Sequence, residues 1–446
     1  MTLRIGAGAG FAGDRIAPAR DLAERGRLDY IAFECLAERT LAFGHLQRAA
    51  DPAKGFHPLL DKRLGAVLAA CVKNGTTIIT NMGVANPRAA GRAAQALAQR
   101  LGLKIRIAVV TGDDITADVG PDTWLPEIGR SVREHGQRVT GANTYLGIDA
   151  ILPALDEQPH LVITGRVADP SLFLAPLVHR FGWARDDWAL LGAGTAVGHL
   201  LECSMQVTGG YFADPPHKLV PNIAHLGFPL AEVLADGRAV VTKLDGTGGL
   251  VSELTVKEQL MYEVHDPAAY LTPDVTADFS TAHITQAGTD RVAVSGVGGR
   301  ERPRQLKAIV GFDGGFLAEG EISYAGPGAA TRAQLAGEIV RERLATVHGN
   351  TDALRLDLIG LNALHGTAMQ GLPAWATQNT DVRLRAALRT PSRAMAENLL
   401  EEVESLWLGG PAGGGGYRGH ITPSVTTQPI YVDRDAIALN IEVLTS

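Results

Sequence analysis

Residues 77–114, TIITNMGVANPRAAGRAAQALAQRLGLKIRIAVVTGDD, determine the fold class that the sequence predicts. A short apolar strand at 77–80 is followed by a helical pattern at 89–101 and by a second apolar strand at 105–110. Near-continuous apolar strands are typical of a parallel sheet that is buried on both faces, and helices connect such strands. The stretch therefore predicts a β-α-β unit.

The same alternation continues through the first two-thirds of the chain. Further strands are expected at residues 3–6, 30–33, 138–141 and 161–164, and a further helix at 64–73. The intervals between the strands are irregular and only six to seven strands are visible. We therefore predict an α/β fold with a doubly wound, mostly parallel sheet rather than an eight-fold barrel. Residues 1–283 form this Rossmann-like domain in our assignment.

The pattern changes beyond residue 284. Strands at 291–295, 305–312 and 316–324, separated by glycine-containing segments such as Asp313-Gly314-Gly315, predict an antiparallel meander. Helices at 332–345 and 392–408 and strands near 353–361 and 382–388 complete the pattern. We assign residues 284–446 to a second, α+β domain.

Composition excludes several classes of function. The chain has 446 residues and a net charge of −7, without a basic block, which argues against nucleic acid as a partner. The N-terminus lacks the features of a signal peptide, and no apolar stretch is long enough to span a bilayer. Cys35, Cys71 and Cys203 have no CxxC spacing, so neither a disulfide framework nor a zinc cluster is expected. We expect a cytoplasmic protein that makes no membrane contact and forms a homo-oligomer.

Polar residues follow the predicted strands at the points where the strands end. In an open α/β sheet, ligands bind in the crevice beyond the carboxyl ends of the strands. The alternative is that some of these residues only cap helices, because Asn, Asp and Thr are favoured at helix N-termini. The candidate substrate-binding residues at this edge are Gly10, Asn81, Asn143, Arg166 and Asp169, and Glu34 is a candidate catalytic carboxylate.

Residues 192–216, GAGTAVGHLLECSMQVTGGYFADPP, predict one wall of an active site. As a helix, the stretch places His199, Glu202 and Cys203 on one face, without the Lys and Arg of a solvated face. His199 and Glu202 are candidates for acid–base catalysis. Cys203 is a candidate nucleophile, although the nearby carboxylate opposes formation of a thiolate. No third ligand can be named for a metal at His199 and Glu202, so no metal site is assigned; an ordinary surface helix is the alternative.

Two glycine-rich loops suggest anion binding. Gly8-x-Gly10-x-x-Gly13 resembles a dinucleotide fingerprint, but Asp14 places a carboxylate where phosphate would bind, and Pro18 moves the helix start to about Arg15. We therefore do not predict NAD or any other tightly bound cofactor.

The second loop, KLDGTGG at 243–249, has consecutive backbone N–H groups that can hold an anion. It makes Lys243, Thr247 and Gly248 candidate substrate-binding residues. A turn between domains is the alternative for this loop.

A family resemblance is carried by six motifs spread over the whole chain. They are IGAGAGFAGDR (5–15), LDYIAFECLAERTL (28–41), VITGRVADPSLF (162–173), GHLLECSMQVTGGYFADPP (198–216), KLDGTGGLVSELTVKEQLMYEVHDP (243–267) and GPAGGGG (410–416). In this order they resemble the acyclic terpene utilisation (AtuA-type) family. The resemblance implies a catabolic setting beside acyl-CoA carboxylases and enoyl-CoA hydratases. Longer members carry a small ferredoxin-like domain after the part seen here, so a separate small partner subunit of that fold is expected.

Together these observations predict a hydratase or lyase that acts on a CoA thioester or a related branched carboxylic acid. Glu202 and His199 supply the acid–base pair, Glu34 is a second carboxylate across the cleft, and Arg166 and Lys243 hold a carboxylate or the phosphates of CoA. Backbone N–H groups of the glycine-rich loops form the oxyanion site, and CoA enters only as part of the substrate. The alternatives are a non-catalytic accessory or ligand-binding subunit of an acyl-CoA-processing complex, and a hydrolase that depends on Cys203 or on a metal.

Overall fold

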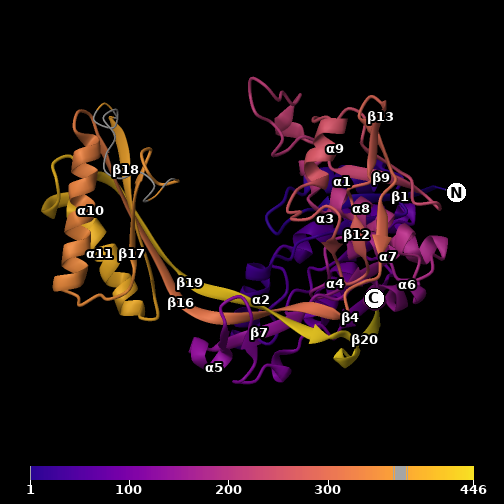
Figure 1. Cartoon of the computed structure of the whole chain (residues 1–446), viewed down its shortest axis with the longest axis horizontal. Coiled ribbons are helices and arrows are strands. Elements are labelled where there is room, and N and C mark those ends of the chain that lie inside the picture. Colours follow the sequence, from indigo (N-terminus) through magenta and orange to yellow (C-terminus); the bar gives the residue numbers. More distant parts are fainter. Residues whose placement is uncertain (1, 365, 367–377, 379) are drawn as a thin grey trace. The chain divides into compact units, whose positions relative to one another are not determined.

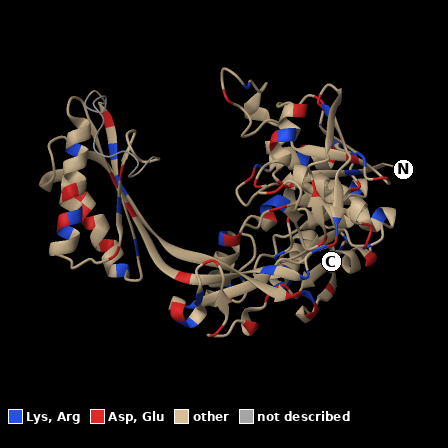
Figure 2. Cartoon of the chain, viewed as in Figure 1, with Lys and Arg blue, Asp and Glu red and all other residues tan. Residues whose placement is uncertain are grey.

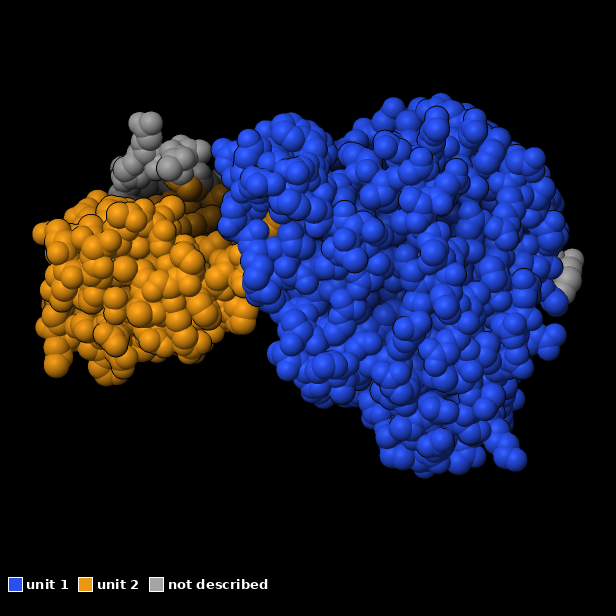
Figure 3. Space-filling view, turned by 90° about the horizontal axis from the view of Figure 1, so that it is seen from below, with its two compact units in different colours: residues 1–311, 427–446 blue, residues 312–426 orange. Residues whose placement is uncertain are grey.

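The chain folds into two compact units (Figures 1 and 3). The computed structural model describes residues 2–364, 366, 378 and 380–446. Unit 1 consists of residues 1–311 and 427–446, and unit 2 of residues 312–426. Two long strands, β16 (Gln305–Ala325) and β19 (Gly415–Asp433), contribute residues to both units. Unit 2 is therefore inserted into the chain of unit 1.

A ten-stranded mixed sheet forms the centre of unit 1. Its strands, in spatial order, are β13 (His283–Gly288), β14 (Arg291–Ser295), β10 (Ala239–Lys243), β9 (Pro229–Leu234), β1 (Thr2–Ala9), β2 (Tyr30–Phe33), β3 (Thr77–Thr80), β8 (Leu161–Ile163), β4 (Arg106–Thr111) and β20 (Asn440–Thr445). The strands from β1 to β4 in this order are parallel to one another. The flanking strands pair antiparallel.

Helices cover both faces of the parallel strands, because these strands are apolar on both sides. In β4, Ala108 and Val110 belong to one core, whereas Ile107 and Val109 belong to the other. The first core includes residues of α6 (Ile148–Asp156), α7 (Ser171–Phe181) and α8 (Trp188–Glu202). The second includes residues of α1 (Ala17–Arg25), α3 (Leu60–Asn74) and α4 (Pro87–Arg100).

The mixed α/β class and the large sheet agree with the sequence prediction, and the doubly wound connectivity stays a prediction. One predicted strand of that sheet lies elsewhere: β7 (Val139–Thr144) pairs with β16. Helix α1 begins at Ala17, beyond the first glycine-rich loop, as Pro18 in its first turn requires. None of the described helices combines the length and apolarity that are needed to cross a membrane.

The remaining elements of unit 1 are shorter or lie at its periphery. They are α2 (Glu38–Ala50), α5 (Val132–His135), α9 (Glu253–Leu260), the strand pair β5 (Trp124–Leu125) and β6 (Arg130–Ser131), and a three-stranded sheet of β11 (Tyr270–Leu271), β12 (Thr276–Asp278) and β15 (Gly298–Arg300).

Unit 2 contains, in its described residues, the order β16, α10 (Ala329–Thr346), β17 (Leu354–Ile359), β18 (Asp381–Thr390), α11 (Arg393–Gly409) and β19. The strands lie in the order β17-β18-β16-β19. This is the split β-α-β topology of ferredoxin-like domains. The resemblance had implied such a fold for a separate partner, and this chain carries the topology within its own sequence.

The two faces of the sheet of unit 2 differ in chemistry. Residues of α10 and α11 join the strands in one apolar core. Ion pairs connect neighbouring strands, and the blue and red segments on these strands in Figure 2 mark them. Arg385 pairs with both Glu319 and Asp357, and Arg383 pairs with Glu321. Each arginine of this ladder is thus paired with at least one carboxylate of a neighbouring strand.

The division of the chain differs from the predicted boundary between residues 283 and 284. Strand β14, predicted as part of a meander, pairs with β10 in the large sheet of unit 1. The predicted turn at Asp313-Gly314-Gly315 lies inside the continuous strand β16. Gly315 has a φ of +73°, and a Cβ there would lie 2.5 Å from the carbonyl oxygen of Thr390. The glycine permits close backbone approach within the sheet, which local sequence cannot distinguish from a turn.

Because the apolar cores of the two units are separate, we expect a core substitution in unit 2 to act on that unit selectively. Leu384 is fully buried in the core of unit 2, so Leu384→Ala should destabilise it by about 2–5 kcal/mol. Ile151→Ala in α6 is the matched change in unit 1. Scanning calorimetry should show a lower transition temperature for a different unit in each variant. A uniform shift of one common transition would contradict the prediction.

Candidate functional site

Two adjoining cavities lie at the carboxyl ends of the parallel strands, where the sequence predicted a ligand crevice. One, of about 460 Å³, has five acidic residues in its lining, and we call it the acid cavity; these are Asp14, Glu34, Asp169, Glu202 and Glu263. The other, of about 620 Å³, we call the large cavity; Tyr145, Arg166, Tyr270, Pro303 and Lys307 are among its lining residues. The two share Leu36, Ala37, Asp169 and Glu263, so they form a continuous cleft.

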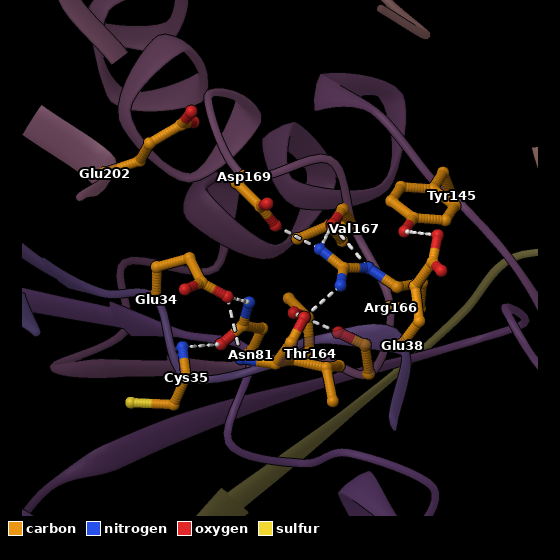
Figure 4. Close-up of polar contacts among 12 residues, drawn as sticks. Glu34, Cys35, Glu38, Asn81, Tyr145, Thr164, Arg166, Val167, Asp169 and Glu202 are labelled. Carbon is orange, nitrogen blue, oxygen red and sulfur yellow. Dashed lines mark hydrogen bonds and ion pairs between the residues drawn. The ribbon is translucent and has the colours of Figure 1, made fainter. Parts of the chain in front are cut away.

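Glu34 directly follows β2 and is held by the end of β3 (Figure 4). Its Oε1 accepts hydrogen bonds from the backbone N–H of Leu36 at 2.7 Å and from the amide of Asn81 at 3.1 Å. Asn81 in turn accepts the N–H of Cys35 at 2.8 Å, which fixes its orientation. Only 7% of Glu34 is exposed. Burial, reinforced by the nearby charge of Asp169, raises the pKa of Glu34 to about 8, so the group is mostly protonated at neutral pH.

Glu202 occupies the end of α8 and forms a pair with His199. His199 Nδ1 lies 2.9 Å from Glu202 Oε1, the separation that i,i+3 spacing on a helix allows. Burial raises the pKa of Glu202, against the opposing effect of His199. In the described part of the chain, Glu202 Oε2 and His199 Nε2 are buried without hydrogen-bond partners. The His199 ring packs against Tyr270, with 5.0 Å between the ring centroids.

Cys203 and Gly10 meet at the edge of the acid cavity. Burial and the charge of Glu202 raise the pKa of the Cys203 thiol, so the environment disfavours a thiolate. A Cβ on Gly10 would lie 2.5 Å from the carbonyl carbon of Cys203, so the glycine permits the loop to pack against the end of α8. The N–H of Gly10 donates to Asp14 at 2.9 Å. The N–H group of Gly10 is therefore hydrogen-bonded within its own loop, to the carboxylate of Asp14.

Arg166 is a buried cation in the wall of the large cavity, and Figure 4 shows its contacts. It is 1% exposed, and its guanidinium donates to the carbonyl groups of Leu36 and Val167 and to Asp169. The guanidinium carbon lies 4.4 Å from the ring centroid of Tyr145. Its donors thus connect the segment after β2 with the loop after β8.

Asn143 lies behind the site, and it is not among the residues that line either cavity. Its amide donates to Asp113 at 2.7 Å, and its carbonyl oxygen lies 2.5 Å from His45 Nε2. Asp113 also accepts the backbone N–H of Arg166 at 2.7 Å. Burial raises the pKa of Asp113 to about 6. Asn143 is therefore linked to Arg166 through Asp113.

The second glycine-rich loop, residues 243–249, does not line the cleft. Lys243 donates to the carbonyl of Thr247 at 3.0 Å and pairs with Asp290 at 3.0 Å. A Cβ on Gly248 would lie 2.1 Å from the carbonyl oxygen of Asn222, so this glycine permits close packing. Lys243, Thr247 and Gly248 are absent from the lining of both cavities.

Several residues of the large cavity escaped the sequence analysis. Tyr145 donates its hydroxyl to Glu38 at 3.0 Å, and Lys307 donates to the same carboxylate oxygen at 2.9 Å. Lys307 comes from β16, far away in the sequence. Glu263 lies within the motif KLDGTGGLVSELTVKEQLMYEVHDP, and Glu38 lies within LDYIAFECLAERTL, so both motifs contained a signal that could have identified them.

A family model, described as acyclic terpene utilisation family protein AtuA, matches residues 3–443. The chain belongs to this family. The match covers nearly the whole chain and confirms the resemblance seen in the motifs. No curated protein and no solved structure shows a significant match. Family membership supports a role in terpene catabolism.

The candidate site contains no ready metal centre in the residues that the structure describes. No group of three His, Cys, Asp or Glu side chains there is arranged to hold an ion. His199 and Glu202 thus contact each other without forming a metal-binding group with a third such residue in this part of the chain.

The raised pKa of Glu34 predicts a specific dependence of stability on pH. A carboxyl whose pKa rises from 4.5 to about 8 on folding binds more protons in the folded state between these values. The free energy of unfolding therefore falls as pH rises from about 5 to 8, by about 1.4 kcal/mol per unit of pKa difference. Glu34→Gln removes this titration and keeps an oxygen for Leu36 and Asn81.

We expect denaturant unfolding to show that Glu34→Gln gains stability relative to the unsubstituted protein as pH rises from 5.5 to 8.5. Glu127→Gln, at an exposed position, is the control, and its free energy of unfolding should depend on pH as that of the unsubstituted protein does. A constant difference between Glu34→Gln and the unsubstituted protein over this range would show that the pKa of Glu34 is not raised.

Proposed function

We propose that this protein is a hydratase or lyase that adds water to, or removes it from, a CoA thioester or a branched carboxylic acid. One observation carries the proposal. Two buried carboxyl groups, Glu34 and Glu202, both with raised pKa values, line the same cavity. Buried carboxyl groups tuned in this way are typical of sites that perform acid–base chemistry near neutral pH.

The reaction divides between the two carboxyl groups. Glu202 Oε2 takes a proton from water while the water oxygen bonds to Cβ of the α,β-unsaturated substrate. The electron pair of the double bond moves toward the carbonyl and gives an enolate. Cα then takes the proton of Glu34, which is protonated at neutral pH. Exchange with solvent restores both groups, and dehydration follows the same steps in reverse.

Neighbouring residues position these two groups. Asn81 holds Glu34 through its side-chain amide, and His199 holds Oε1 of Glu202. The large cavity, with its aromatic and proline side chains, has room for the remainder of an acyl substrate. CoA enters as part of the substrate in this proposal. The homo-oligomer, the small partner subunit and the cytoplasmic location stay predictions.

The alternatives have less support from the site. A hydrolase that uses Cys203 needs a thiolate, which burial and Glu202 disfavour. An accessory subunit without activity leaves the two tuned carboxyl groups without a role.

We expect Glu202→Gln to abolish most turnover without unfolding the protein, because glutamine cannot accept the proton. General acid–base groups contribute roughly 10²–10⁴-fold, so the rate should fall by about that factor. The assay follows the loss of ultraviolet absorbance when crotonyl-CoA or 3-methylcrotonyl-CoA is hydrated. Glu258→Gln is the control, because Glu258 is paired with Lys218 and is not in the lining of the acid cavity. Retention of most activity by Glu202→Gln would overturn its assignment.

The pH profile provides an independent test of Glu34 as the acid. Since the protonated form is required for hydration, kcat/KM should decline above pH 8, approaching tenfold per pH unit. The measurement covers pH 6 to 10 in a constant-ionic-strength buffer. A profile that stays flat to pH 9.5 would exclude Glu34 from this role.

A further inference from the structure

The large cavity contains a cation that the described residues leave without a counter-charge. Its cationic lining residues are Arg39, Arg166 and Lys307. The guanidinium of Arg166 is buried and already bonded to a carboxylate and to backbone carbonyl groups, and Lys307 is paired with Glu38. The side chain of Arg39 is exposed and forms no ion pair within the described part of the chain. Its guanidinium carbon lies 5.4 Å from the ring centroid of Phe43, also in α2.

The carboxyl groups near this arginine are largely engaged elsewhere. Glu38 Oε1 accepts hydrogen bonds from Lys307 at 2.9 Å and from the Tyr145 hydroxyl at 3.0 Å, and Figure 4 shows the contact with Tyr145. Asp169 is paired within the buried network after β8. Glu263 is the remaining carboxyl group among the described lining residues, and it lies in the wall shared with the acid cavity. An anion can therefore approach the free guanidinium from the large cavity.

An exposed aromatic ring lies at the same cavity. Tyr431, from β19, is one of the lining residues, and 58% of it is exposed. Pro273 and Pro303 line the cavity too, and Arg434 donates to their carbonyl groups at 2.6 and 3.1 Å. These hydrogen bonds fix the proline wall, whereas the tyrosine ring has a face available to a flat ligand. Base rings stack on exposed aromatic side chains of this kind.

The two features together indicate the chemistry of the ligand. Arginine presents a planar set of donors that fits the oxygens of a phosphate group. An exposed aromatic ring fits a heteroaromatic base. A free carboxylic acid would engage the arginine and leave the ring without a role. A nucleotide engages both, and CoA carries an adenine nucleotide with phosphate groups at the end opposite its thioester.

We propose that Arg39 and Tyr431 bind the adenine-nucleotide end of CoA, so that the substrate is a CoA thioester and not a free acid. The inference rests on the proposed function and identifies its substrate class. Arg39 binds a phosphate group, the role that the sequence assigned to Lys243, and the ring of Tyr431 stacks on adenine. The pantetheine arm lies in the large cavity. The acyl group extends into the acid cavity, with which the large cavity is continuous.

The first test uses adenosine 3′,5′-bisphosphate, which has the nucleotide but no thioester, in titration calorimetry. We expect Arg39→Gln to weaken its binding about tenfold, because a hydrogen bond between two charged groups is lost. Arg20→Gln, at an exposed position of α1 outside both cavities, is the control and should bind as the unsubstituted protein does. Added salt should weaken binding to the unsubstituted protein, because it screens exposed charges.

Tyr431 is tested with the same ligand. Tyr431→Ala should also weaken binding about tenfold, since it removes the stacking surface. Tyr431→Phe keeps the ring and should keep the affinity. Full affinity in both Arg39→Gln and Tyr431→Ala would overturn the inference, as would an unsubstituted protein that does not bind the bisphosphate.

The outcomes separate this inference from the proposed function. If the bisphosphate binds as expected but no CoA thioester is hydrated, the nucleotide site stands and the proposed reaction is wrong. If thioesters are hydrated and Arg39→Gln leaves their KM unchanged, the reaction stands and the nucleotide site is wrong. Glutarate is the probe for a carboxylate at Arg39. If glutarate binds in a manner that depends on Arg39 and the bisphosphate does not bind, the arginine holds a substrate carboxylate and the nucleotide site is wrong.

Discussion

A fully buried guanidinium, that of Arg166, is the interaction on which the polar edge of unit 1 depends. Its donors reach the carbonyl of Leu36 after β2 and the Val167–Asp169 loop after β8. Its backbone N–H donates to Asp113, which follows β4. A buried charge is tolerated only where hydrogen bonds and an opposite charge replace its hydration. The ends of three parallel strands are therefore held together by one residue, and removing its side chain would leave Asp169 without this partner.

This constraint also affects the acidity of the cleft. Burial is the largest cause of the raised pKa of Glu34, with Asp169 acting in the same direction and Arg166 against it. The pairing of Asp169 with Arg166 limits how far these two charges act on Glu34. A neutral carboxyl can thus be kept beside a charged pair, although burying it costs stability at high pH. We regard that cost as the consequence of keeping a proton donor in the cleft.

The sequence was informative where local chemistry decides the structure. Apolar runs located β2 and β3, and the polar residues after them located Glu34 and Asn81 at the cleft. Prediction from the sequence failed where contacts between distant segments determine the structure. Gly10 is required by the backbone of Cys203, and Gly315 by that of Thr390, partners that no local pattern reveals. The insertion of unit 2 was missed for the same reason, because β16 and β19 meet only in the folded chain.

The hydrogen bonds of the two carboxyl groups add a geometric argument for reversible proton transfer. In Glu34, Oε1 accepts both available N–H groups, so the proton of the acid form resides on Oε2. In Glu202, Oε1 contacts His199 and Oε2 has no partner in the described residues. Each group therefore has one oxygen fixed by the protein, and in the proposed reaction the second oxygen exchanges the proton. Fixing one oxygen orients the other without consuming it, as a catalytic acid and base both require.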